Sequence, residues 1–199
     1  MEKEIRLNPL IFCFLLSVLS LLLLLILILA CSILPFNVGI LTYLTLPTFI
    51  ALFLVPKLIE LFYKRKIEIV KQKKYTVRPI FSIGIFLLLL TCYWFFLQDK
   101  FENGDDFLLL VFHYLIVSLG EEYMYRDLML NSLRSSYSVY VSVILSSILF
   151  AFIGHLNESI MINLVVRFPL GLILGWIASK TNSITYPIII HTLYNLIVS

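Results

Sequence analysis

The chain has 199 residues, of which 61% are hydrophobic and 14% are charged, and its formal net charge is +3. Ordinary soluble proteins carry about a quarter charged residues, so this composition excludes a single water-soluble globule. A transmembrane helix needs roughly 20 mostly apolar residues, and a helix satisfies its own backbone hydrogen bonds in lipid. We therefore expect a chain of membrane-spanning helices with no nucleic-acid partner.

The apolar segments follow one another along the whole sequence. Leu7 to Pro56 is long enough for two spans, with a break near Pro35–Gly39 because proline and glycine mark turns. Five more spans are expected at Pro79–Leu97, Phe107–Asn131, Tyr137–His155, Ser159–Ser179 and Ile184–Val198. The predicted fold is an all-α, polytopic transmembrane helical bundle of about seven spans, with six to eight as the range.

The loop charges predict the orientation, because short cytoplasmic loops retain lysine and arginine. The loop Lys57–Arg78 is strongly basic, whereas the loop Asp99–Asp106 is mostly acidic. We therefore place the basic loop and the N-terminus in the cytoplasm. The same loop accounts for most of the net charge and is a candidate for contact with anionic lipid head groups.

The N-terminal run resembles a secretory signal, since it is charged at Met1–Arg6 and ends at Ala30-Cys31. We interpret it as a retained anchor, because it is more than twice as long as a typical signal core. The cysteines are odd in number and lack metal or redox spacing, so we expect inert packing residues at Cys13, Cys31 and Cys92.

Glu121, Glu122 and Arg126 form the sharpest polar cluster within the spans. An ionisable side chain near the middle of a membrane costs at least about 2.5 kcal/mol and is a functional candidate. Residues four apart share a helix face, so Glu122 is expected to pair with Arg126, while Glu121 points about 100° away and stays free. A free buried carboxylate can act as a general base. The alternative is that the three charges only hold helices together.

Two histidines extend this candidate site. His191 and Asn195 are four residues apart in the last span, where they can donate hydrogen bonds to a developing oxyanion. Metal ligation is the alternative role of the imidazole. His155 ends the fifth span, and by itself it has the plain interpretation of a residue at the membrane interface, but we keep it in the site. His113 has the same plain interpretation, and we leave it out.

Arg167 is a further intramembrane charge that needs a partner. We hypothesise that it is the counter-ion of Glu121 or Glu122, because other acids within the spans are scarce. Its alternative is to snorkel to the membrane surface.

The order Glu121-Glu122-x-x-x-Arg126, then His155 after a Phe-containing helix, then His191-x-x-x-Asn195 resembles the CPBP family. This family includes type II CAAX prenyl endopeptidases and bacteriocin-processing or self-immunity (Abi) proteins. The resemblance also includes Gly171–Trp176 and Thr181–Pro187. It implies a membrane protease core at residues 79–199, preceded by a transmembrane hairpin and basic loop at residues 1–78, in a single domain overall.

The resemblance implies that Glu121, Glu122, His155, His191 and Asn195 are catalytic. Glu121 and His155 would activate water, while His191 and Asn195 would stabilise the oxyanion or help hold a metal. Zinc is possible on Glu121, His155 and His191, which would leave a position open for water, but the His-Glu-x-x-His pattern is absent. The cofactor prediction is therefore open between none and zinc.

The second motif departs from the family pattern, which usually has phenylalanine four residues before the histidine. Ala151 stands there, with phenylalanines at 150 and 152 instead. A one-residue adjustment near Gly154 would restore the packing. Straight helices would also leave His155 closer to the outer membrane surface than Glu121, so tilt, a broken fifth helix or a re-entrant segment is needed.

Three functions remain open at this stage. The first is an endopeptidase in a bacterial plasma membrane that cleaves hydrophobic, prenylated or leader-type peptides. The second is a non-catalytic bacteriocin self-immunity protein on the same scaffold. The third is a small transporter or proton relay, which we rank last because such a protein has no need of these ordered motifs.

Overall fold

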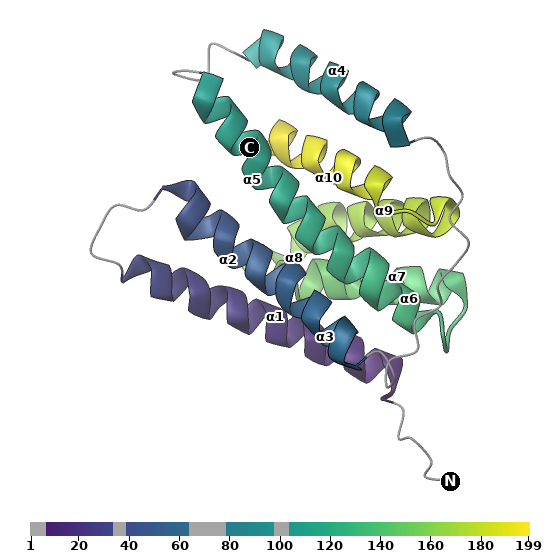
Figure 1. The fold of residues 1–199 in the computed structure, drawn as a ribbon. Coiled ribbons are helices and arrows are strands. Elements are labelled where there is room, and N and C mark those ends of the chain that lie inside the picture. Colours follow the sequence, from purple (N-terminus) through teal and green to yellow (C-terminus); the bar gives the residue numbers. More distant parts are fainter. Residues whose placement is uncertain (1–6, 34–38, 64–78, 98–103) are drawn as a thin grey trace.

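The computed structural model describes residues 7–33, 39–63, 79–97 and 104–199. Within them it contains seven continuous helical segments and no strand, with consecutive segments running in alternating directions (Figure 1). Four are long and apolar enough to cross a membrane, namely Pro9–Ser32, Leu41–Phe62, Gly104–Leu133 and Ile160–Thr181. Shorter apolar helices lie at Ile83–Phe95, Val139–Phe152 and Thr185–Val198. The protein is thus a polytopic helical bundle, as the composition predicts.

The segments divide into α-helices and short π-helices. The first is α1 (Pro9–Ser32), and the second comprises η1 (Leu41–Thr45), α2 (Leu46–Phe49), η2 (Ile50–Leu54) and α3 (Val55–Tyr63). The third and fourth are α4 (Pro79–Leu97) and α5 (Gly104–Glu122), the latter continued by η4 (Tyr123–Met129) and α6 (Leu130–Leu133). After α7 (Val139–Phe152) follow α8 (Ile160–Ile162), η5 (Asn163–Arg167), α9 (Phe168–Thr181) and α10 (Thr185–Val198).

Local sequence signals explain several helix ends. The side chain of Asn8 accepts a hydrogen bond from the backbone of Leu10, with proline at the first helical position of α1. Ser138 caps α7 and Ser159 caps α8 in the same way. Asn182 ends α9 in the left-handed conformation, at φ 50°, which asparagine tolerates better than most residues.

Some expectations fall outside the described residues. These are the charged N-terminal residues 1–6, residues 34–38 of the predicted break, most of the basic loop at 64–78, and residues 98–103 of the acidic loop. Asp105 and Asp106, which we had assigned to that loop, lie in the first turn of α5. Acidic side chains are favourable there because the N-terminal end of a helix carries partial positive charge.

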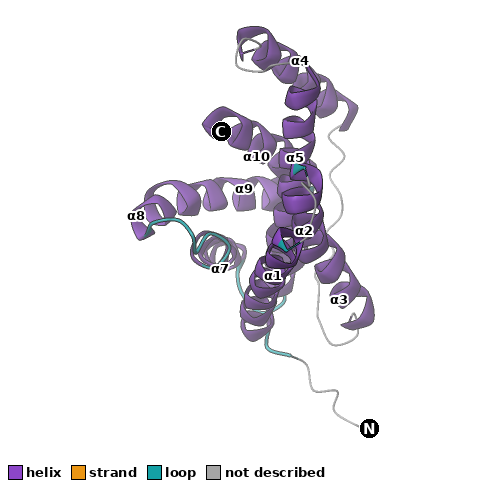
Figure 2. Cartoon of the chain, turned by 90° about the vertical axis from the view of Figure 1, so that its left-hand side faces the viewer, coloured by secondary structure: helices purple, strands orange, loops and turns teal. Residues whose placement is uncertain are grey.

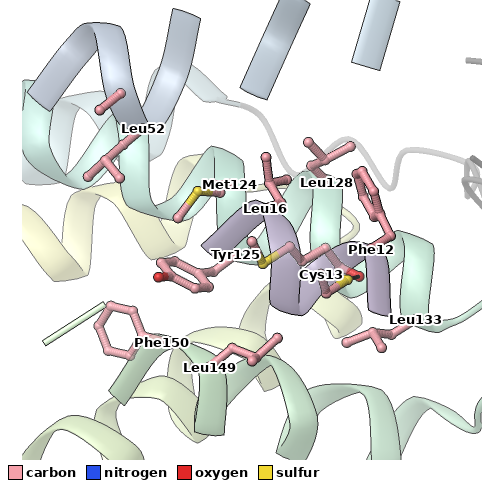
Figure 3. Close-up of a cluster of buried hydrophobic side chains, with 12 residues drawn as sticks. Phe12, Cys13, Leu16, Leu52, Met124, Tyr125, Leu128, Leu133, Leu149 and Phe150 are labelled. Atoms are coloured by element: carbon pink, nitrogen blue, oxygen red, sulfur yellow. Dashed lines mark hydrogen bonds between the residues drawn. The ribbon is translucent and has the colours of Figure 1, made fainter. Parts of the chain in front are cut away.

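The hydrophobic core lies where α1 and η2 pack against η4, α6 and α7. Figure 3 shows this cluster, with Tyr125 and Phe150 facing each other at one end. Its buried members are Phe12, Cys13, Leu16, Ala51, Leu52, Met124, Tyr125, Leu128, Met129, Leu133, Leu149 and Phe150. Helices from the N-terminal half and from the C-terminal half therefore share one core.

Helix α9 packs closely on α7 through Gly171 and Gly175. A Cβ atom on Gly171 would lie 3.1 Å from Cβ of Ser147, and one on Gly175 would lie 3.2 Å from Val143. Small residues spaced by four let two helix backbones approach closely in membranes. This contact holds η5 and α9 beside the C-terminal end of α7.

Helix α10 packs along α5 and places the C-terminus beside it (Figure 1). Helix α4 lies at the edge of the bundle (Figure 2). The hydroxyl of Tyr93 in α4 donates to the carbonyl of Leu196 in α10, and the Tyr93 ring stacks on Phe107 of α5. At the other end of α5, Gly120 and Glu122 are buried.

Candidate active site

The C-terminal end of α5 and the middle of α10 bring two glutamates to one histidine. His191 Nδ1 donates to Oε1 of Glu122 at 2.8 Å, while His191 Nε2 lies 3.5 Å from Oε2 of Glu121. The imidazole therefore has a carboxylate beside each ring nitrogen. The prediction that Glu121 stands free is corrected, because packing of α10 on α5 places His191 between the two acids.

Arg126 lies next to Glu122, as the spacing of four predicts. Its Nε is 3.4 Å from Oε2 of Glu122, and both side chains are fully buried. The Arg126 guanidinium also lies over the ring of Phe150, with its carbon 4.5 Å from the ring centroid. A buried ion pair of this kind is costly to break, since the partner left behind is a charge without compensation.

The two glutamates differ in their access to the surroundings. The Glu121 side chain is 13% exposed, whereas that of Glu122 is 0% exposed. Glu121 Oε2 also has no hydrogen-bond partner in the described structure. Glu122 thus orients His191 and is held by Arg126, while Oε2 of Glu121 is itself buried and faces His191 Nε2.

His155 lies in the turn after α7. The Phe150 ring lies between it and His191 and contacts both. The Phe150 ring centroid is 4.7 Å from the His155 ring and 5.8 Å from the His191 ring, edge-on to both. His155 Nδ1 is 3.0 Å from the carbonyl oxygen of Phe150. A carbonyl can only accept, so Nδ1 of His155 carries a proton.

The turn supplies the one-residue adjustment expected near Gly154. Helix α7 ends at Phe152, and the backbone N–H groups of Ile153 and Gly154 both donate to the carbonyl of Leu149. Phe150, five residues before His155, thereby takes the place beside the histidine that Ala151 cannot fill. Because α7 is broken before His155, this residue is not carried further along a straight helix.

The close packing of this turn predicts the effect of a single methyl group. A Cβ atom on Gly154 would lie 2.6 Å from the Phe150 carbonyl oxygen and 2.7 Å from the Tyr125 hydroxyl oxygen. We expect Gly154→Ala to lower the stability by about 1–3 kcal/mol and to displace His155. On α4, a Cβ on Gly84 meets nothing within 4 Å, so Gly84→Ala should be harmless. Thermal unfolding in detergent measures the stability of both variants. Equal unfolding midpoints for Gly154→Ala and Gly84→Ala would contradict this packing.

The other predicted residues are placed as follows. Asn195 is buried on α10 one turn after His191, and among the described residues no hydrogen bond joins its side chain to the other candidate residues. His113 is buried and lies 2.8 Å from the hydroxyl of Thr45, on a more N-terminal part of α5. It is a packed, hydrogen-bonded residue outside the cluster.

The predicted role of Arg167 as counter-ion of Glu121 or Glu122 is wrong. Arg167 Nη2 donates to Oε1 of Glu158 at 3.1 Å, and its guanidinium lies 5.8 Å from the Tyr194 ring centroid. The acids within the spans already have His191 and Arg126 beside them. Arg167 instead pairs with Glu158 in the turn that follows α7. The prediction had considered only acids within the spans.

The donor set does not form a preassembled metal centre. In residues 7–33, 39–63, 79–97 and 104–199, no three or more His, Cys, Asp and Glu side chains gather so as to hold an ion. Glu121 and His191 are adjacent, but the Phe150 ring packs edge-on against both histidines. Glu121, His155 and His191 therefore do not fit a zinc ion in this conformation.

Sequence reasoning missed several residues that support the cluster. Phe150 and Gly154 were noted only as part of a departure from a motif, and Asn163 and Glu158 were not noted. A lone amide in the apolar segment Met161–Val166 was the available signal for Asn163. For Tyr125, whose ring meets Phe150 edge-on at 5.4 Å, an aromatic residue among apolar neighbours gave no signal.

The fold and this cluster define a polytopic integral membrane protein with buried glutamate, histidine and arginine side chains in contact. Residues 103–197 match the family described as type II CAAX prenyl endopeptidase Rce1-like. This match confirms the resemblance drawn from the three motifs. The match covers helices α5 to α10 and every candidate residue. Searches of curated proteins and of solved structures found no match to the chain.

Proposed function

We propose that the protein is a membrane-embedded endopeptidase that hydrolyses peptide bonds in hydrophobic or lipid-modified peptides. The observation that carries the proposal is the contact of both ring nitrogens of His191 with Glu121 and Glu122. A structural ion pair needs one acid for Arg126. The second acid, Glu121, is not needed for that pair and lies beside His191 Nε2, where a carboxylate can accept a proton and return it.

Glu121 is the general base in this proposal. It removes a proton from water as the water oxygen bonds to the scissile carbonyl carbon, and it later gives that proton to the leaving amine as the carbon–nitrogen bond breaks. His155 assists by accepting a hydrogen bond from the same water at Nε2. The protons balance, because the leaving amine receives the proton that Glu121 took from the water.

His191 and Asn195 stabilise the oxyanion that forms on the carbonyl oxygen. Glu122 accepts the Nδ1 proton of His191 and so fixes the orientation of the ring, which donates from Nε2 to the oxyanion whenever it is protonated. Fixed donors in a site with little water are among the largest contributions to catalysis. The buried position of Asn195 on the same helix supports its role as the second donor.

We also propose that the N-terminus faces the cytoplasm of a bacterial cell. Lys57, Arg134 and Lys180 lie at or near the ends of the second, fourth and sixth helical segments, which alternation places on one side. Asp105 and Asp106 lie at the opposite end of the bundle. This asymmetry supports the orientation that the basic loop predicts.

The test is cleavage of a panel of hydrophobic, prenylated and leader-type reporter peptides by detergent-purified protein. Wild type should cleave at least one class, and His155→Gln should reduce its kcat by about a hundredfold. Parallel reactions with a zinc chelator, followed by zinc addition, determine whether an ion is needed. If wild type cleaves nothing while both proteins protect cells from a bacteriocin, the non-catalytic self-immunity function replaces this proposal.

A further inference from the structure

The turn between α7 and α8, residues 153–159, carries His155 but belongs to no helix. Non-helical backbone in a membrane protein needs partners from the protein itself wherever water is scarce. Two side chains of η5 contact this turn. Asn163 Nδ2 donates to the carbonyl oxygen of His155 at 2.9 Å, and Arg167 Nη2 donates to Oε1 of Glu158 at 3.1 Å.

The geometry of η5 explains why both side chains reach the same turn. Asn163 and Arg167 are four residues apart in one π-helical turn, so they project from nearly the same side. The backbone of Asn163 also donates to the carbonyl of Ser159, the residue that caps α8. The start of the sixth helical segment is thus tied to the turn at three places.

The two side-chain contacts differ in character. Asn163 is 3% exposed, and its Oδ1 has no hydrogen-bond partner in the described structure, so its Nδ2 bond fixes an otherwise costly buried amide. The Arg167 and Glu158 side chains are 15% and 27% exposed. Partly exposed ion pairs are weaker and are screened by salt. The Asn163 hydrogen bond is therefore expected to be the stronger of the two contacts, and the Arg167–Glu158 ion pair the weaker, salt-dependent one.

We propose that Asn163 is a positioning residue for His155, with the Arg167–Glu158 pair as a second anchor of the same turn. His155 is then held at its backbone carbonyl by Asn163 and at its ring by the Phe150 carbonyl. Two fixed points on one residue determine the direction in which Nε2 points. The value of this direction for catalysis rests on the proposed function, whereas the contacts themselves do not.

The experiment compares Asn163→Leu with Asn157→Leu, a change at an exposed asparagine of the same turn. The chain has three histidines, so ¹⁵N spectra of the imidazoles in detergent micelles can be assigned with single histidine variants. We expect the His155 signals of wild type to report a proton on Nδ1. Asn163→Leu should shift these signals and leave those of His113 in place, and Asn157→Leu should shift neither.

The kinetic readout separates positioning from general damage. Asn163→Leu should lower kcat by about tenfold with little change in KM, the size expected when one aligning hydrogen bond is lost. Asn163→Gln, which retains the amide donor, should recover part of that loss. Reversing the ion pair with Glu158→Arg and Arg167→Glu together should restore activity that each single change reduces.

Unchanged His155 signals in a folded Asn163→Leu protein would overturn the proposal. If Asn163→Leu does not fold, the Asn163→Gln spectrum and the reversed ion pair decide the question in its place. Shifted His155 signals in a protein whose wild type cleaves no peptide would leave the positioning role intact and reject the peptidase instead.

Discussion

Glu121→Gln is expected to abolish peptide hydrolysis while the protein stays folded. Glutamine keeps the shape of the side chain but cannot accept a proton from water, and loss of a general base costs about 10²–10⁴ in rate. The Glu121 side chain is partly exposed and glutamine fills the same space, so the unfolding midpoint should change little. The measurement is kcat/KM on the best reporter peptide, alongside thermal unfolding.

Asp105→Asn is the matched control for this prediction. It removes a carboxylate from an exposed position in the first turn of the same helix, far from His191. Its activity should equal that of wild type. A Glu121→Gln protein that retains more than about a tenth of wild-type activity would exclude Glu121 as the general base.

Arg126→Met is expected to have the largest effect on stability. Arg126 and Glu122 are fully buried and 3.4 Å apart, so removing the guanidinium leaves the Glu122 charge without its cation. Breaking a buried pair on one side costs about 3–5 kcal/mol. The loss also removes the cation that lies over Phe150, the ring against which both site histidines pack. Chemical unfolding in detergent, monitored by tryptophan fluorescence, gives the free energy.

The double variant Arg126→Met/Glu122→Gln tests the cause of that loss. It removes both charges, so it should be more stable than Arg126→Met alone, although its His191 would lose the orienting carboxylate and activity should stay low. Lys180→Met, at an exposed lysine over Trp176, should change the stability by less than about 1 kcal/mol. A double variant less stable than Arg126→Met would show that charge pairing is not the reason.

The helices themselves were readable from the sequence because lipid imposes a strong constraint. Each apolar stretch between polar loops became a helical segment, since an unbonded backbone is not tolerated in hydrocarbon. The errors lie at the ends. Helix α7 ends at Phe152 rather than at His155, where Gly154 allows the chain to turn against Tyr125. Helix α5 begins at Gly104 because its first turn accepts two aspartates.

Within the site, spacing along one helix was also sufficient for the pair Glu122 and Arg126. Contacts between different helices could not be predicted in this way, because residue spacing carries no information on how one helix faces another. The sequence by itself determined the membrane class, the helical order and the candidate residues, since hydropathy and i,i+4 spacing are local properties. Only the tertiary structure decided that His191 lies between Glu121 and Glu122, that Phe150 rather than residue 151 meets His155, and that Arg167 pairs with Glu158. Each of these depends on the packing of α10, α7 and η5 around α5, which is set by side chains far apart in the chain.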